Sequence, residues 1–84
     1  MSLMGSKGSL SDAIEAAICQ AIPGATAKVA GSGGHFDVSV VSDAFEGKSL
    51  LAKHRLVMSV LAPFMQGDDA PVHAIDNLET KTPN

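Results

Sequence analysis

A short amphipathic helix in the second half of the chain limits the folds open to this sequence more than any other feature. Ser49 can cap its start, because a serine hydroxyl accepts a hydrogen bond from a backbone N–H in the first helical turn. Pro63 lacks a backbone N–H donor, so we expect the helix to bend or end near Ala62. The side chains that recur at helical spacing, and therefore share one face, are Leu50, His54, Val57, Met58, Leu61 and Met65.

His54 is the one polar member of this stripe. Since buried polar groups are normally hydrogen-bonded, the simplest interpretation is a packed histidine with a backbone or hydroxyl partner. The alternative interpretation is that His54 contacts a ligand or a partner protein at a surface. Its neighbours Lys53 and Arg55 lie outside the middle of the stripe, and we expect both to reach solvent.

The segments before this helix predict one more helix and a β-hairpin. Leu10–Ile22 has apolar residues at helical spacing and is followed by a Pro-Gly pair that ends the helix. Ala25–Ala30 and Phe36–Ser42 alternate between apolar and polar residues, as strands with one buried face do. The glycine-rich connector Gly31–Gly34 between them favours a hairpin.

The last predicted strand, Val72–Thr82, follows the central helix, and a strand–helix–strand crossover joins parallel strands. We therefore predict an α+β fold in the order α-β-β-α-β, with a three-stranded mixed sheet and both helices on one face. A single domain over residues 9–84 suits the length, since 84 residues support one modest core. Residues 1–8 show no periodicity and are expected to form a disordered N-terminal tail.

Charge and composition argue against several classes of function. The formal net charge of −3 argues against a protein that holds nucleic acid by bulk charge. No apolar run approaches the ~20 residues that a membrane helix needs, and no secretory signal is evident, so we expect no membrane association. The single cysteine, Cys19, cannot form an internal disulfide, which favours a reducing, cytoplasmic setting.

Catalytic patterns cannot be identified either. Ser, Asp and His are present, but none is part of a nucleophile elbow or a paired-carboxylate arrangement, so we expect no enzyme activity. His35 and His73 form a different kind of candidate site. His35 lies near the start of the second predicted strand and His73 near the start of the third. If these two strands run parallel and adjacent, both imidazoles emerge at the same end of the sheet. The pattern alone leaves open whether they form one site or are two unrelated surface histidines.

Three ordered segments resemble the BolA-like family. The longest is VVSDAFEGKSLLAKHRLV at residues 40–57; the others are GSGGHF at residues 31–36 and VHAI at residues 72–75, followed by KTP at residues 81–83. The resemblance covers roughly residues 10–83, nearly the whole chain. It implies the BolA-like fold, which is similar to a type II KH domain.

The resemblance also implies a function. BolA-like proteins are partners of monothiol glutaredoxins, with which they share a bridged [2Fe–2S] cluster. The glutaredoxin supplies a cysteine and a bound glutathione thiolate, and the BolA-like partner supplies the histidine that matches His73. A second ligand comes from the loop before the second strand; since residues 30–34 contain no His or Cys, His35 is the candidate here.

On this interpretation the chain is a non-catalytic adaptor in iron–sulfur cluster handling and iron regulation. The cluster would be present only in the complex with glutaredoxin and glutathione, because the single Cys19 cannot hold it unaided. The isolated chain is expected to have no cofactor and to be a monomer or a weak dimer.

A second class of function follows from the resemblance, because members of the family have been described as transcriptional regulators with a helix-turn-helix-like segment. The candidate contacts for nucleic acid or a partner protein are Lys48, Lys53, His54 and Arg55. Three cations are few, and no aromatic side chain lies among them for base stacking. Direct nucleic-acid binding is therefore the alternative and not the main prediction.

The third strand departs from the family's pattern. Between His73 and Pro83 the chain has one residue more than the family's usual spacing, and Asp76 and Asn77 are poor strand formers. An added residue turns every later side chain to the other face unless a bulge absorbs it, so we expect a β-bulge at these two residues. The family also usually continues past the Thr-Pro pair into a C-terminal helix, whereas this sequence ends at Asn84.

Overall fold

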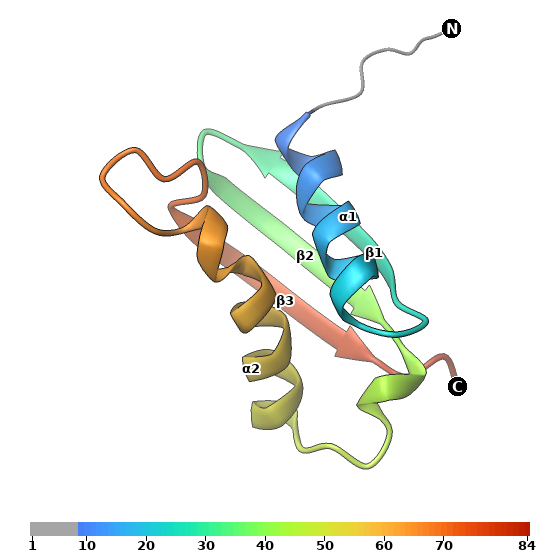
Figure 1. Ribbon diagram of the computed structural model, residues 1–84. Helices are drawn as coiled ribbons and strands as arrows, with labels where there is room; N and C mark the ends of the chain where they lie inside the picture. Colours follow the sequence, from blue (N-terminus) through green and yellow to red (C-terminus); the bar gives the residue numbers. More distant parts are fainter. Residues whose placement is uncertain (1–8) are drawn as a thin grey trace, which may run out of the picture.

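The computed structural model describes residues 9–84 (Figure 1). Its elements are α1 (Leu10–Ala21), β1 (Thr26–Ser32), β2 (His35–Val41), η1 (Asp43–Phe45), α2 (Leu50–Leu61), η2 (Ala62–Phe64) and β3 (Ala74–Lys81), where η marks a short 3₁₀ helix. The predicted α+β fold is confirmed, and each predicted strand boundary lies within two residues of the observed one. The tail predicted for residues 1–8 lies outside the described residues.

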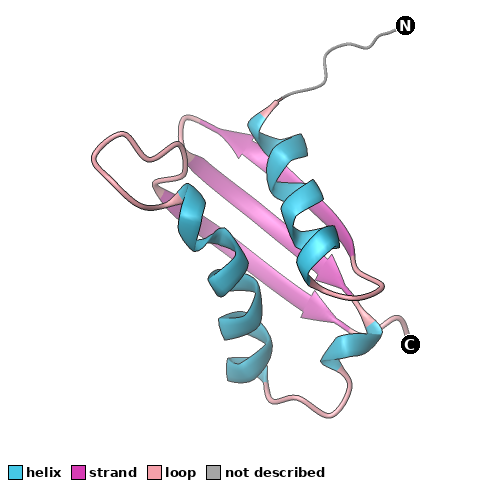
Figure 2. Ribbon diagram, viewed as in Figure 1, coloured by secondary structure: helices cyan, strands magenta, loops and turns pink. Residues whose placement is uncertain are grey.

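The sheet has three strands in the order β1-β2-β3. β1 and β2 pair antiparallel, as a hairpin requires, whereas β2 and β3 pair in parallel. Two parallel strands need a crossover connection, which α2 provides. Both helices lie on one face of this mixed sheet and leave the other face open (Figure 2). Neither helix in residues 9–84 is long and apolar enough to cross a membrane.

The hydrophobic core lies between the helices and the covered face of the sheet. Successive strand residues point to opposite faces, so Phe36, Val38 and Val40 of β2 are buried while Asp37 between them is exposed. The helical segments contribute buried side chains spaced one turn apart, namely Ile14, Ile18, Ile22, Val57 and Leu61.

A β-bulge interrupts β3, as the sequence predicts. Phe36 of β2 pairs with Ile75, but the next residue of β2 pairs with Asn77, so Asp76 is the extra residue. Ile75 and Leu78 are three positions apart, and both pack against the core because the bulge absorbs the odd residue. Regular alternation would have turned one of them to the open face.

Helix α2 has the predicted start and end, but the prediction that Leu50 belongs to its buried face is wrong. The hydroxyl of Ser49 accepts a hydrogen bond from the N–H of Ala52 at 3.1 Å, and the helix passes into η2 at Ala62. Leu50, which the apolar stripe places in the core, is instead 62 % exposed. Helical side chains tilt toward the N-terminus, so the side chain of this first residue extends beyond the packed part of α2.

The bulge can be tested by two deletions. Removing Asp76 restores regular alternation in β3 and keeps its apolar residues on the covered face. We therefore expect the free energy of unfolding to change by no more than about 1 kcal/mol. Removing Glu79 instead turns the charged Lys81 inward and should cost about 2 kcal/mol or more. Urea unfolding followed by circular dichroism measures both values, and equal losses would contradict the role given to the bulge.

Candidate functional site

Two histidines lie at one end of the sheet. His35 is the first residue of β2 and pairs with Ala74, the first residue of β3. His73 immediately precedes β3, and its N–H donates a hydrogen bond to the carbonyl oxygen of Gly34 at 2.7 Å. The N–H of Ala74 donates to the same oxygen at 3.0 Å. The parallel pairing thus brings both histidines to the same end of the sheet, as the strand order predicts.

The ring of His73 lies against Gly34. This glycine has a φ of +85°, a backbone conformation that other residues rarely adopt. A Cβ atom at position 34 would lie 2.8 Å from both Cγ and Nδ1 of His73, too close for an unshifted ring. Glycine therefore does two things here: it allows the turn of the chain and leaves room for the imidazole. His73 is nevertheless exposed to solvent.

The imidazole of His35 lies on the open face of the sheet and contacts the bulge. Its Nδ1 is 3.3 Å from Oδ1 of Asp76, and the side chain is 58 % exposed. A carboxylate beside this nitrogen favours the tautomer with the proton on Nδ1, which leaves a lone pair on Nε2. The bulge therefore accommodates the extra residue without disturbing the core, and that residue contacts a candidate metal ligand.

Neither histidine belongs to a complete metal site within residues 9–84. In residues 9–84 no group of three or more His, Cys, Asp or Glu side chains could hold a metal ion. Cys19, the one thiol of the sequence, is on α1. This end of the sheet can therefore offer imidazole ligands to an iron centre whose remaining ligands come from elsewhere.

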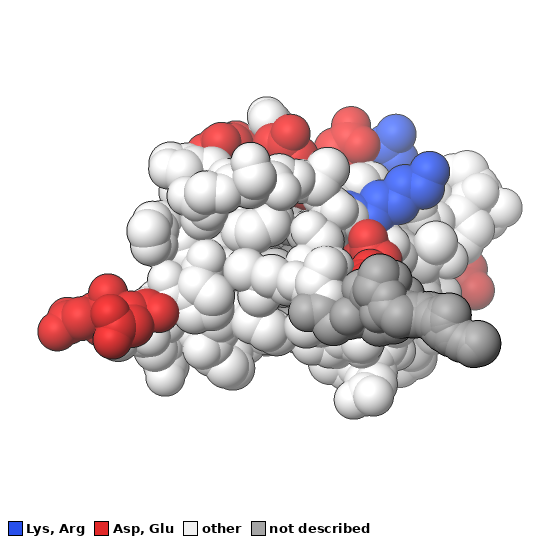
Figure 3. All heavy atoms as spheres, turned by 90° about the horizontal axis from the view of Figure 1, so that it is seen from above, with Lys and Arg blue, Asp and Glu red and all other residues white. Residues whose placement is uncertain are grey.

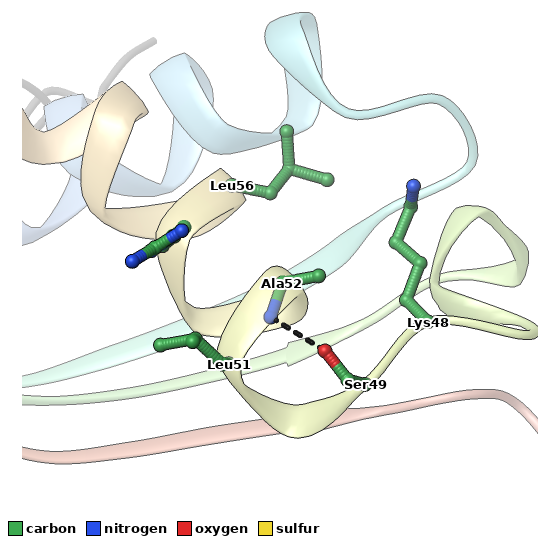
Figure 4. Close-up of a pocket in the computed structure, with 6 residues that line it drawn as sticks. Lys48, Ser49, Leu51, Ala52 and Leu56 are labelled. Carbon is green, nitrogen blue, oxygen red and sulfur yellow. Dashed lines mark hydrogen bonds between the residues drawn. The ribbon is translucent and has the colours of Figure 1, made fainter.

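The second predicted set of contact residues does not form one surface. Lys48 and Arg55 are exposed and line a hollow at the start of α2 (Figure 4). Lys53 was expected to reach solvent, but it is half-buried, and its ammonium group donates to the carbonyl oxygen of Thr80 at 3.4 Å. The reason is that α2 packs beside β3, so this part of the helix faces a strand.

His54 is half-buried, and among the histidine rings of residues 9–84 that of His35, and not that of His54, has a hydrogen-bond partner. The sequence predicts a backbone or hydroxyl partner for this histidine, and the described part of the chain does not provide one. A ring that is partly exposed can bond to water instead, so its polar atoms do not require a protein partner.

The sequence patterns do not directly predict two features of the surface. One is the contact between His35 and Asp76, which results from the parallel register and the bulge together; the sequence predicts both of these. The exposure of Leu51, which is 60 %, also has a signal, because Leu51 lies outside the apolar stripe that includes Val57 and Leu61.

Comparison with known proteins identifies similar sequences and folds. A family model described as BolA-like protein matches residues 17–84. BolA-like protein 1 of Mus musculus is 48 % identical over 60 residues, which are 71 % of this chain and 41 % of the mouse protein. The chain therefore spans less than half of that relative's length.

Two solved structures have a similar fold. A bolA protein homologue from Coxiella burnetii superposes with a TM-score of 0.71 and 34 % identity, covering 89 % of this chain and 91 % of the other. The BolA domain of SufE1 from Arabidopsis thaliana superposes with a TM-score of 0.74 and 30 % identity, covering 90 % of this chain and 94 % of that domain.

Replacing Gly34 with alanine tests how His73 is held. The added methyl group would meet the ring, so the imidazole NMR signals of His73 should shift in Gly34→Ala. Gly33→Ala is the matched control, because Gly33 also has a positive φ, +65°, but a Cβ there meets nothing within 4 Å. Both variants have similar backbone strain, on the order of 1–3 kcal/mol. Equal shifts of the His73 signals in the two variants would contradict the packing of His73 on Gly34.

Proposed function

This chain belongs to the BolA-like family, and we propose that it is a non-catalytic adaptor in iron–sulfur cluster handling. In this proposal the chain binds a monothiol glutaredoxin, and a [2Fe–2S] cluster bridges the two proteins. His73 is the main ligand from this chain and His35 is the second. The glutaredoxin contributes a cysteine thiolate and the thiolate of a bound glutathione.

The observation that carries the proposal is the pair of exposed imidazoles at one end of the sheet. A [2Fe–2S] cluster needs four ligands besides its bridging sulfides, and two histidines can replace two thiolates on one iron, as in Rieske centres. Two imidazoles from this chain and two thiolates from the partner complete such a set. When bound, the cluster would supply one-electron chemistry at a higher potential than an all-thiolate cluster does.

The surroundings of the two histidines suit this role. Asp76 beside Nδ1 of His35 leaves Nε2 of that ring available to a metal, and outer carboxylates of this kind commonly orient metal-binding histidines. Gly34 leaves space for the ring of His73 without covering it. The occurrence of a BolA domain in SufE1 is also consistent with an iron–sulfur related role.

No observation favours catalysis or direct nucleic-acid binding over this proposal. The serine hydroxyls with hydrogen bonds in residues 9–84 bond to helix N–H groups, carbonyl oxygens or Glu79, and not to a histidine that could activate them. The alternative, a nucleic-acid-binding regulator, loses one of its three predicted cations because Lys53 is bonded to Thr80. The two exposed cations, Lys48 just before α2 and Arg55 on it, are a small electrostatic footprint for a nucleic acid.

Reconstitution with a glutaredoxin tests the proposal. The chain is mixed with a monothiol glutaredoxin, iron, sulfide and glutathione, and the visible absorption and circular dichroism spectra are compared with those of the glutaredoxin alone. We expect His73→Ala to leave the fold intact, because an exposed side chain contributes little packing. It should nevertheless shift the spectrum toward that of the all-thiolate glutaredoxin homodimer.

Two further variants sharpen this experiment. His35→Ala should give the same spectral change if His35 is the second ligand, and no change if it is not. His54→Ala is the control, because it removes a histidine from α2 and not from the sheet end. A His73→Ala protein that forms an unaltered hetero-complex cluster would remove the main ground for the proposed function.

A further inference from the structure

The start of α2 exposes two large apolar side chains. Leu50 and Leu51 are 62 % and 60 % exposed, and they are the two exposed large hydrophobic residues of the described chain. Single exposed leucines are common on protein surfaces, but adjacent ones beside a hollow are typical of binding sites.

A hollow of about 450 Å³ lies beside Leu51. Ala52 and Leu56 are four residues apart on α2 and share one side of the helix, whereas Lys48 lies just before the N-cap Ser49. Ala52 is the smallest of these three side chains. Figure 4 shows Lys48 and Leu56 extending on either side of Ala52. Ser49 and Arg55 complete the lining. We call these five residues, together with Leu51, the α2 notch.

The α2 notch is basic at its rim on a molecule that is otherwise acidic. Lys48 and Arg55 make no ion pair with another residue in the described part of the chain. The net charge of the protein is −3, and its exposed carboxylates include Asp37 and Glu79 on the open face of the sheet. Figure 3 shows acidic side chains gathered along one side and at one end of the molecule, with few basic ones among them.

We propose that the α2 notch binds an acidic segment of a partner protein that places a large apolar side chain against Leu51 and Ala52. Carboxylates on either side of that anchor would pair with Lys48 and Arg55. Arginine and lysine at the rim of an apolar contact give specificity and a faster association rate. An aliphatic surface contributes nothing to holding phosphates, so this chemistry fits a protein segment better than a nucleic acid.

A second copy of this chain does not fit the α2 notch. Within residues 9–84 the exposed large apolar side chains are Leu50 and Leu51, and both lie at the start of α2. The acidic surfaces of a second copy therefore offer no apolar anchor. Contact between two α2 notches would bring like charges together, which opposes association. The occupant is therefore a different protein.

The α2 notch and the two histidines lie at opposite ends of the molecule. Lys53, beside the α2 notch, contacts Thr80 near the end of β3, whereas His73 precedes the start of that strand. At the histidine end, the N–H of Val72 donates to the carbonyl of Phe64, just after α2. The inference goes beyond the proposed function and does not depend on it, because the two surfaces can be occupied at once.

Selection from random peptides displayed on phage tests this inference with the isolated chain as the target. We expect enriched peptides to combine Asp or Glu with Leu, Ile, Phe or Met. Synthetic copies should shift the backbone NMR signals of Lys48, Leu51, Ala52 and Arg55. Ala52→Leu fills the α2 notch and Arg55→Glu reverses its charge; each should weaken peptide binding about tenfold or more.

The control is Ala16→Leu, which makes the same change at an exposed position of α1 and should leave peptide binding unchanged. Thermal melts confirm that each variant is folded. The inference is overturned if no peptide is enriched, if enriched peptides are neutral or basic, or if they shift signals elsewhere. Displacement of the peptide by double-stranded DNA of random sequence at physiological salt would also overturn it. None of these outcomes bears on cluster formation with a glutaredoxin, so the two proposals fail separately.

Discussion

The parallel pairing of β2 with β3 is the constraint on which the rest of this structure depends. Two parallel strands begin at the same end of the sheet, so the chain must return along the sheet between them, and α2 makes that return. His35 and His73, at the starts of these strands, therefore lie at the same end of the sheet, while the start of α2 lies at the other end. The parallel pairing thus separates the end of the sheet that carries the two histidines from the α2 notch.

Much of this arrangement could be predicted from the sequence, because it rests on local patterns. Alternation in β2 predicts its buried face, Ser49 predicts the start of α2, and the spacing of Ile75 and Leu78 predicts the bulge. What could not be predicted depends on contacts between distant segments. Periodicity cannot show that Leu50 extends past the packed part of α2 or that Lys53 meets Thr80.

The bulge connects the folding of the chain to its candidate site. It is needed to keep both apolar residues of β3 in the core, and it places Asp76 on the open face beside His35. The predicted roles of His35 and His73 as ligands come from family resemblance, and the geometry adds a reason why each ring is suitably placed. Gly34 leaves room for the ring of His73, and Asp76 lies beside Nδ1 of His35.

The central claim is that this chain supplies imidazole ligands to a cluster shared with a monothiol glutaredoxin. Pulsed electron paramagnetic resonance of the reduced hetero-complex tests it most directly when this chain alone is labelled with ¹⁵N. Iron-bound imidazole should give ¹⁵N couplings clearly stronger than those of backbone N–H groups near a cluster. A reduced hetero-complex whose spectrum contains only the weaker backbone couplings would contradict the claim.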